Sequence, residues 1–182
     1  MKRAGVRTSS DGTRRAEPAP VDPAFPRYTT GPLPAYRFIP GRSPHPRRSP
    51  HGHSWGLPEP RVQTMAPEAW ASCPLYLRGV DLFNHAYWWE SHEAFEALWR
   101  GTSEGPTREL LQALIQLAAA EIKRFSEMPA AARTLSDRAL SRLAGVPDHH
   151  LGLDVRALAR DVDARVAGAR AAPLLLRLTD LA

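Results

Sequence analysis

The densest group of chemically active residues in this chain lies in residues 87–100, which read YWWESHEAFEALWR. This stretch holds three of the chain's five tryptophans, one histidine and three glutamates. Within it, His92, Glu93 and Glu96 bring an imidazole and two carboxylates together, because residues three and four apart lie on the same face of a helix. An imidazole and two carboxylates at this spacing could bind a metal ion or carry out acid–base chemistry.

The spacing is similar to that of the zinc-protease motif His-Glu-x-x-His, in which the two histidines bind the metal and the glutamate is the general base. In this chain Glu96 takes the place of the second histidine. His92 and Glu96 are therefore the candidate metal ligands, and Glu93 is the candidate catalytic base. A mixed set of imidazole and carboxylate ligands suits Zn, Mn or Fe.

Two ligands from one helix do not complete a metal site, so the missing ligands must come from other segments. The candidates are His45, His51 and His53, in a proline-rich segment, and Glu121. In an extended chain residues 51 and 53 share one face and could reach the same ion. Glu121 falls on the apolar face of the helix expected at 106–125, where a carboxylate should be paired, protonated or metal-bound.

The same residues also have a structural interpretation. Glu93 and Glu96 could be solvated or paired with Arg100, and His92 could form an ordinary hydrogen bond at the edge of the core. The protein would then be a non-catalytic helical module that binds a protein partner. The residues alone leave both functions open.

Composition limits the class of protein. At 182 residues, with 43% hydrophobic and 24% charged residues, the chain is typical of one globular domain. Residues 1–60 hold 10 Lys/Arg against 4 Asp/Glu (+6), and the remainder holds 14 against 15 (−1). A single cysteine, Cys73, excludes an internal disulfide. No apolar run suits a signal peptide or a membrane span, so we expect a soluble, cytoplasmic protein with no membrane partner.

The basic N-terminal segment is the feature that would favour nucleic acid. It lacks aromatic residues interleaved with its arginines, and it has no recognition motif, which argues against a nucleic-acid partner. A small-molecule substrate or a protein is the expected partner.

The elements that position the candidate residues are helices. Residues 1–35 are basic and rich in Pro, Ser and Thr, which predicts disorder. Residues 36–66 predict an extended Pro/His-rich arm, because closely spaced prolines forbid a helix. Residues 67–170 predict an all-α, up-and-down helical bundle of about five helices, and residues 171–182 a C-terminal tail that forms a docking turn or a short helix.

The expected helices span residues 68–84 with an interruption near Pro74, and then 87–100, 106–125, 129–144 and 154–167. No segment predicts a strand. A turn is expected at Asn84-His85-Ala86, because Asn tolerates a left-handed backbone better than most residues.

The run LFNHAYWWESHEAFEALWR, followed by LLQALIQLAAAEIKR, resembles the small all-helical family called domain of unknown function 309. The shared pattern is an F-N turn, an aromatic-W-E-x-H-E-x-x-E-x-x-W helix and a Q-x-L-I-Q-x-A-A-A helix, and it covers residues 75–145. The arm, YRFIPGRSPHPRRSPHGHSW, is similar to an extension present in a subset of this family.

The resemblance implies a helical fold, and it implies the activity of a metal-dependent hydrolase, since some members are labelled as predicted enzymes of that kind. Members often have Gly in the turn, where this chain has His85-Ala86. The positions of interest that the resemblance implies are Asn84, Glu90, His92, Glu93, Glu96, Trp99 and Gln116.

Overall fold

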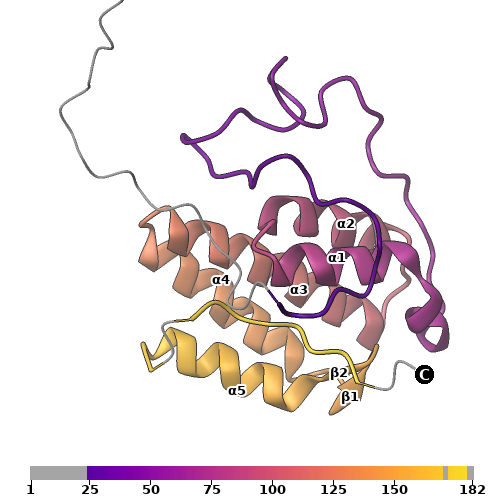
Figure 1. Cartoon of the computed structure of the whole chain (residues 1–182). Helices are drawn as coiled ribbons and strands as arrows, with labels where there is room; N and C mark the ends of the chain where they lie inside the picture. The colour runs from indigo at the N-terminus through magenta and orange to yellow at the C-terminus, as the bar shows by residue number, and fades with distance from the viewer. Residues whose placement is uncertain (1–23, 170–171, 180–182) are drawn as a thin grey trace, which may run out of the picture.

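The computed structural model describes residues 24–169 and 172–179, so the disorder predicted for residues 1–23 lies outside the described residues (Figure 1). The described chain is mostly helical, which confirms the prediction of an all-α bundle. A 3₁₀ helix, η1, precedes the α-helices. The elements are η1 (Pro67–Ser72), α1 (Pro74–Asn84), α2 (Trp88–Arg100), α3 (Pro106–Phe125), α4 (Pro129–Leu143) and α5 (Val155–Val166).

Local sequence signals explain where these helices begin and end. Three of the α-helices have proline at their first position, where its missing N–H has no helical partner to lose: Pro74, Pro106 and Pro129. α5 begins with a side-chain cap, since Asp154 Oδ1 accepts a 2.7 Å hydrogen bond from the Ala157 N–H. α2 ends at Gly101, where a Cβ atom would lie 2.4 Å from the Gln63 carbonyl oxygen. The chain before η1 therefore runs directly against the end of α2.

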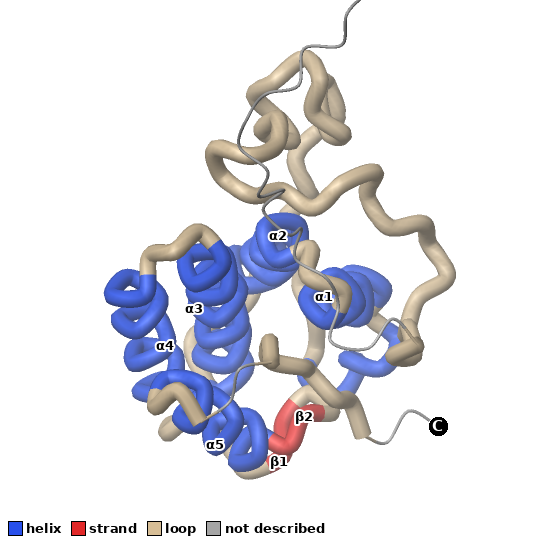
Figure 2. The backbone as a smooth tube through the Cα atoms, turned by 60° about the vertical axis from the view of Figure 1, so that its left-hand side comes forward, coloured by secondary structure: helices blue, strands red, loops and turns tan. Residues whose placement is uncertain are grey.

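Each helix packs on the next one in sequence, as the tube view shows (Figure 2). The apolar residues of each helix recur at intervals of three and four, which places them on one stripe. Most of the largest side chains with less than 2% exposure come from α1, α2 and α3, and these include Tyr76, Phe83, Phe95, Leu98, Leu110, Leu111, Leu114 and Leu117. In the part of the chain that is described, no helix has both the length and the apolar character needed to cross a membrane.

The turn between α1 and α2 differs from the prediction. Asn84 is the last residue of α1, and Ala86 instead has the left-handed backbone, with φ of 64°. Hydrogen bonds from Ala86 N to Phe83 O and from Tyr87 N to Leu82 O close the turn. This is the turn in which the resemblance leads us to expect Gly, a residue that takes positive φ without strain.

A short antiparallel hairpin, absent from the prediction, lies between α4 and α5. β1 (His149–His150) pairs with β2 (Leu153–Asp154) through a two-residue turn whose residues, Leu151 and Gly152, have φ of 47° and 74°. Positive φ at both turn positions matches the twist of paired strands. The C-terminal segment, residues 172–179, forms no helix. It buries Leu174–Leu176 against the bundle and pairs Leu178 with Leu153 in an isolated bridge.

The arm, residues 24–66, covers α2 and part of α1 (Figures 1 and 2). Residues 24–35, whose composition predicts disorder, lie against α1. The fully buried carboxylate of Asp81 accepts hydrogen bonds from the backbone N–H groups of Tyr28 (2.7 Å) and Thr29 (2.8 Å). Further along, Phe38 and Ile39 are buried. The docked part of the chain therefore begins earlier than the predicted boundary at residue 36.

Candidate metal centre

Three side chains on the outer face of α2 bring potential ligand atoms together. His92 Nδ1 lies 4.0 Å from Glu93 Oε1 and 3.9 Å from Glu96 Oε2, and one ligand atom from each residue lies within 4.8 Å of the others. Each side chain is 24–30% exposed, so the cluster is open to solvent. Ligands 2.0–2.2 Å from a tetrahedral ion lie about 3.4 Å apart, so the two distances from His92 would have to shorten by about half an ångström, and no pair by more than about 1.4 Å, to fit one ion. The donor set therefore suits a divalent metal.

Two arginines hold the carboxylates of this cluster. Arg100 donates a 2.8 Å hydrogen bond to Glu96 Oε1 from one turn along α2. Arg47 reaches in from the arm, and its Nε lies 3.5 Å from Glu93 Oε2. The same guanidinium donates hydrogen bonds to the carbonyl groups of Leu57 and Pro58, which fix its position. Each carboxylate therefore has a positive charge beside it already.

Burial sets the protonation of the cluster. It lowers the pKa of His92 below 6.5, against the opposing attraction of Glu96, so the imidazole is neutral at pH 7. Burial also raises the pKa of Glu93, and Arg47 opposes that rise. Neutral imidazole is the form that binds metals, and a carboxylate with a raised pKa is a better base than a solvated one.

Two of the predicted arm histidines, His45 and His53, contact α2, but beside the cluster and not within it. His53 Nε2 lies 2.8 Å from Glu90 Oε1, and both side chains are less than 10% exposed. Burial raises the pKa of Glu90, while the hydrogen bond to His53 opposes the rise. Glu90 Oε2 is buried and has no hydrogen-bond partner among the described residues. This contact makes the Glu90–His53 pair the buried polar link between α2 and the arm.

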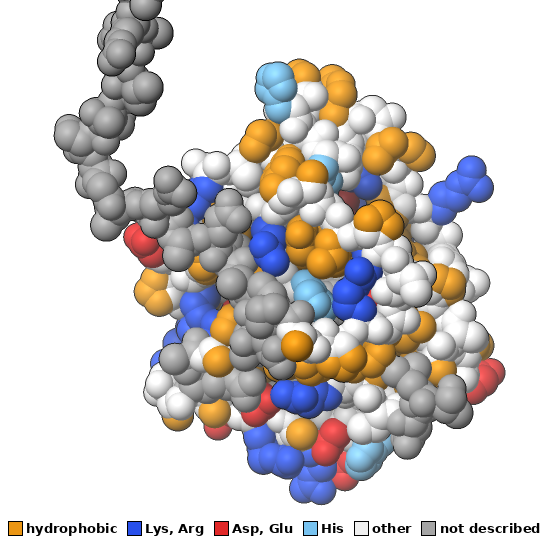
Figure 3. Space-filling view, in the orientation of Figure 1, with side chains coloured by type: hydrophobic (Ala, Val, Ile, Leu, Met, Phe, Trp, Pro, Cys, Tyr) orange, Lys and Arg blue, Asp and Glu red, His pale blue; other side chains and the backbone are white. Residues whose placement is uncertain are grey.

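His45 and His51 have other surroundings. The His45 ring packs edge-on against Trp89, with centroids 5.4 Å apart, and its Nδ1 accepts hydrogen bonds from the backbone N–H groups of Arg47 and Arg48. The side chain of His51 is exposed. Figure 3 shows this surface of the arm at the top of the view, with histidine and apolar side chains exposed. Within the described residues, the group of three potential ligands contains neither His45 nor His51.

Asn84 and Glu121, two other candidates, bind parts of the fold together. Asn84 forms a paired contact with Leu176, accepting from its N–H at 2.7 Å and donating to its carbonyl at 2.8 Å. Glu121 is 1% exposed and forms a two-pronged ion pair with Arg165 of α5, at 2.6 and 2.7 Å. Of the three states expected for a carboxylate on that apolar face, the paired one is present.

Trp99 and Gln116 have contacts of their own outside the group of three ligands. The guanidinium of Arg108 stacks over the Trp99 ring, 4.0 Å from its centroid. Gln116 lines a groove between α3 and α4, and its buried Oε1 lacks a hydrogen-bond partner among the described residues.

Three residues that contribute to this arrangement were not predicted from the sequence: Asp81, Arg47 and Arg165. Asp81 and Arg165 carried a usable signal, because each is a charged residue at an apolar position of its helix, Arg165 following Leu158 and Val162 at helical spacing. Arg47 carried none, since its role depends on the path of the arm.

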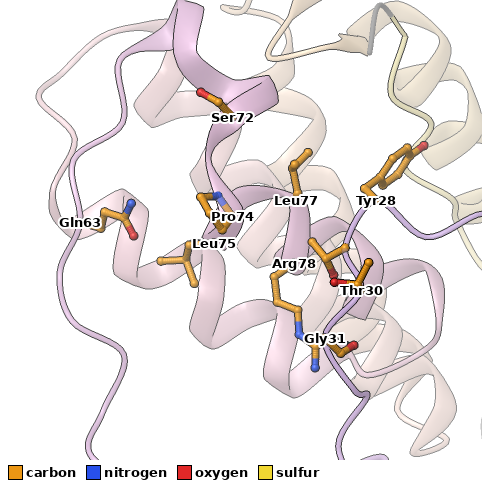
Figure 4. A pocket seen from close by; sticks show the side chains of 10 residues that line it. Tyr28, Thr30, Gly31, Gln63, Ser72, Pro74, Leu75, Leu77 and Arg78 are labelled. Atoms are coloured by element: carbon orange, nitrogen blue, oxygen red, sulfur yellow. Dashed lines mark hydrogen bonds between the residues drawn. The ribbon is translucent and has the colours of Figure 1, made fainter. Parts of the chain in front are cut away.

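A cavity of the described chain lies elsewhere. It has a volume of about 750 Å³ and opens between the start of α1 and the arm, next to Tyr28, Gly31, Leu75 and Arg78 (Figure 4). Arg78, whose side chain extends along this wall, donates a 3.1 Å hydrogen bond to the Gly31 carbonyl. None of His92, Glu93 and Glu96 lines this cavity.

The protein is therefore an all-α bundle with a partly exposed His/Glu cluster on α2. The arm packs beside this cluster and contacts it through Arg47. The model of the family described as Domain of unknown function (DUF309) matches residues 76–135, which confirms the resemblance. The match contains the whole cluster, and it leaves the arm and α5 outside. No curated protein matches this sequence.

Proposed function

We propose that His92 and Glu96 bind one divalent metal ion next to Glu93, which acts as the general base, and that the protein is a metal-dependent hydrolase. The observation that carries this proposal is the convergence of one imidazole nitrogen and two carboxylate oxygens on an open face of α2. These donors suit Zn, Mn or Fe. When bound, such an ion supplies Lewis acidity, which polarises the carbonyl or phosphoryl oxygen of a substrate.

Each side chain of the cluster then has a separate role. His92 supplies the nitrogen ligand, and its lowered pKa keeps that nitrogen unprotonated. Glu96 supplies an oxygen ligand one helical turn away. Glu93 is the general base that takes a proton from water, a role for which its raised pKa is suited. Arg47 and Arg100 lie close enough to neutralise the carboxylates in the metal-free protein.

A second function has an observation in its favour. Each of three α2 carboxylates already has a basic partner: Glu90–His53, Glu93–Arg47 and Glu96–Arg100. Carboxylates whose charges are paired in this way need no ion, which supports a non-catalytic module in which the arm and α2 together form a protein-binding surface.

Metal binding separates the two functions. Wild-type protein stripped with a chelator is titrated with Mn²⁺ and Zn²⁺ by calorimetry, beside His92→Ala and, as the matched control, His51→Ala. The hydrolase predicts one ion per chain, lost in His92→Ala and kept in His51→Ala. If the wild type binds no ion, the metal-dependent hydrolase is ruled out and the protein-binding module remains as the proposed function.

The base is tested separately in metal-loaded protein. Glu93→Gln keeps the size and shape of the side chain but cannot accept a proton. The hydrolysis of p-nitrophenyl acetate and p-nitrophenyl phosphate should fall by about 10²–10⁴-fold, the usual contribution of a positioned base. Equal rates in the wild type and Glu93→Gln would remove Glu93 from this role.

A further inference from the structure

A polar groove runs between α3 and α4, on a part of the bundle that the proposed metal site does not use. Its volume is about 600 Å³, and six side chains line it: Glu109, Gln112 and Gln116 from α3, and Arg138, Ser141 and Arg142 from α4. Its size falls within the range of small-molecule sites. Every lining residue is polar, so an apolar ligand is disfavoured.

Two buried atoms of this lining have no hydrogen-bond partner among the described residues: Gln116 Oε1 and Arg142 Nε. Arg142 is otherwise held in place, because its Nη1 donates a 2.8 Å hydrogen bond to Glu109 Oε2. Buried donors and acceptors are nearly always paired in folded proteins. One acceptor and one donor left in the same groove therefore favour a ligand that offers both kinds of group.

The charge of the groove indicates the class of ligand. Two arginines and one glutamate leave one positive charge in excess. Glu109 pairs with Arg142, and the excess charge is that of Arg138, whose exposed side chain forms no ion pair within the described ranges. The planar guanidinium fork of arginine matches a carboxylate or a phosphate and repels a cation.

We propose that the α3–α4 groove binds a small hydroxylated organic anion. Its phosphate or carboxylate pairs with Arg138, and a hydroxyl group donates a hydrogen bond to Gln116 Oε1. This site is independent of the metal centre, and it gives Gln116 a role that the His/Glu cluster does not.

The test is a titration of the ¹⁵N-labelled full chain, followed by the shifts of its backbone amides. The probes are ribose 5-phosphate, gluconate, ribose and inorganic phosphate. Ribose 5-phosphate or gluconate should shift amides of α3 and α4 around the six lining residues, and should bind about tenfold more tightly than ribose or inorganic phosphate, since a hydrogen bond to a charged group contributes about that factor.

Matched variants localise the binding. Arg138→Gln should lower the affinity for the organic anion about tenfold. Arg133→Gln is the control and should leave the affinity unchanged, because Arg133 lies on the same helix, has a side chain that is 68% exposed, and is outside the groove. Gln116→Leu should remove the preference for ribose 5-phosphate over inorganic phosphate. The proposal is overturned if neither organic anion shifts these amides, or if Arg138→Gln and Arg133→Gln bind alike.

Discussion

The buried ion pair between Glu121 and Arg165 provides the sharpest test of how this bundle is held together. Glu121 lies 1% exposed on α3, and Arg165 lies 7% exposed on α5. Two charged hydrogen bonds of 2.6 and 2.7 Å join them, and Arg165 also donates a 2.8 Å hydrogen bond to the Ala172 carbonyl. The pair therefore ties α3, α5 and the C-terminal segment at one point.

Glu121→Gln keeps the shape of the side chain but leaves the Arg165 charge buried without a counter-charge. Removing one partner of a buried pair costs about 3–5 kcal/mol. Domains of this size are stable by about 10 kcal/mol, so this one change should remove a third to a half of the free energy of unfolding. Urea unfolding followed by circular dichroism measures the loss directly.

The double variant Glu121→Leu/Arg165→Met separates an uncompensated charge from lost packing. Because both charges are gone, we expect it to be more stable than either single variant, and close to the wild type. Asp137→Asn, which breaks a pair exposed on both sides, should cost about 0–1 kcal/mol.

The reasoning about this pair is refuted by either of two results. One is a loss below about 1 kcal/mol for Glu121→Gln, where about 3–5 kcal/mol is expected. The other is a double variant as unstable as the sum of its singles. The same Glu121→Gln protein should bind metal as the wild type does, because Glu121 is engaged by Arg165 and lies outside the His/Glu cluster.

Three further predictions concern the arm, the C-terminal segment and the cluster. Gly52→Ala would put a Cβ 2.2 Å from the Pro46 carbonyl oxygen. Amide hydrogen exchange in the arm should therefore become about tenfold faster or more. In the control Gly31→Ala the new Cβ has no neighbour nearer than 3.9 Å, so the exchange rates should change little. Asn84→Ala leaves a buried N–H and C=O unpaired and should lower the free energy of unfolding in urea by about 2–4 kcal/mol. Metal affinity measured by calorimetry should fall at acid pH, once His92 is protonated, with a midpoint below 6.5 because burial lowers its pKa.

Each of these predictions has a contrary outcome. Equal exchange in the two glycine variants would mean that the arm turn does not pack as described. An unfolding free energy within about 0.5 kcal/mol of the wild type for Asn84→Ala would mean that water replaces the lost bonds. A midpoint above 6.5 would show that the attraction of Glu96 outweighs the burial of His92.

The fold was largely readable from the sequence because its signals are local. Pro74, Pro106 and Pro129 each mark the first residue of a helix, and Asp154 caps α5. The hairpin at 149–154 was missed because strands of two residues leave no periodicity to detect. The left-handed residue of the α1–α2 turn was placed at Asn84, but the backbone puts it at Ala86, against the intrinsic preference of Ala.

The candidate site was readable only in part, for the same reason. His92, Glu93 and Glu96 meet because helical geometry alone brings them together. The ligands expected from the arm depend on contacts some 40 residues apart in sequence, which no local pattern determines. Alternation in an extended chain puts residues 51 and 53 on one face, but the arm turns at this point, so His53 contacts Glu90 and the side chain of His51 is exposed.

The arm and a metal ion would compete for the same negative charge, so the two proposed functions are coupled and one variant can separate them. Arg47 lies 3.5 Å from Glu93, and two arm carbonyl groups hold it there. If the cluster binds an ion, Arg47→Gln removes a competing cation, and affinity for Mn²⁺ should rise about three- to tenfold, as expected for a partly exposed pair.

If the cluster is purely structural, the same variant instead loosens the arm, with faster amide exchange at 45–58 and no metal bound at any concentration tested. Arg48→Gln, an exposed neighbour in the same turn, serves as the control, because it alters the charge of the arm equally and leaves Glu93 untouched. Equal effects of the two variants would show that the contact between Arg47 and Glu93 does not link the arm to the cluster, since only net charge would then matter.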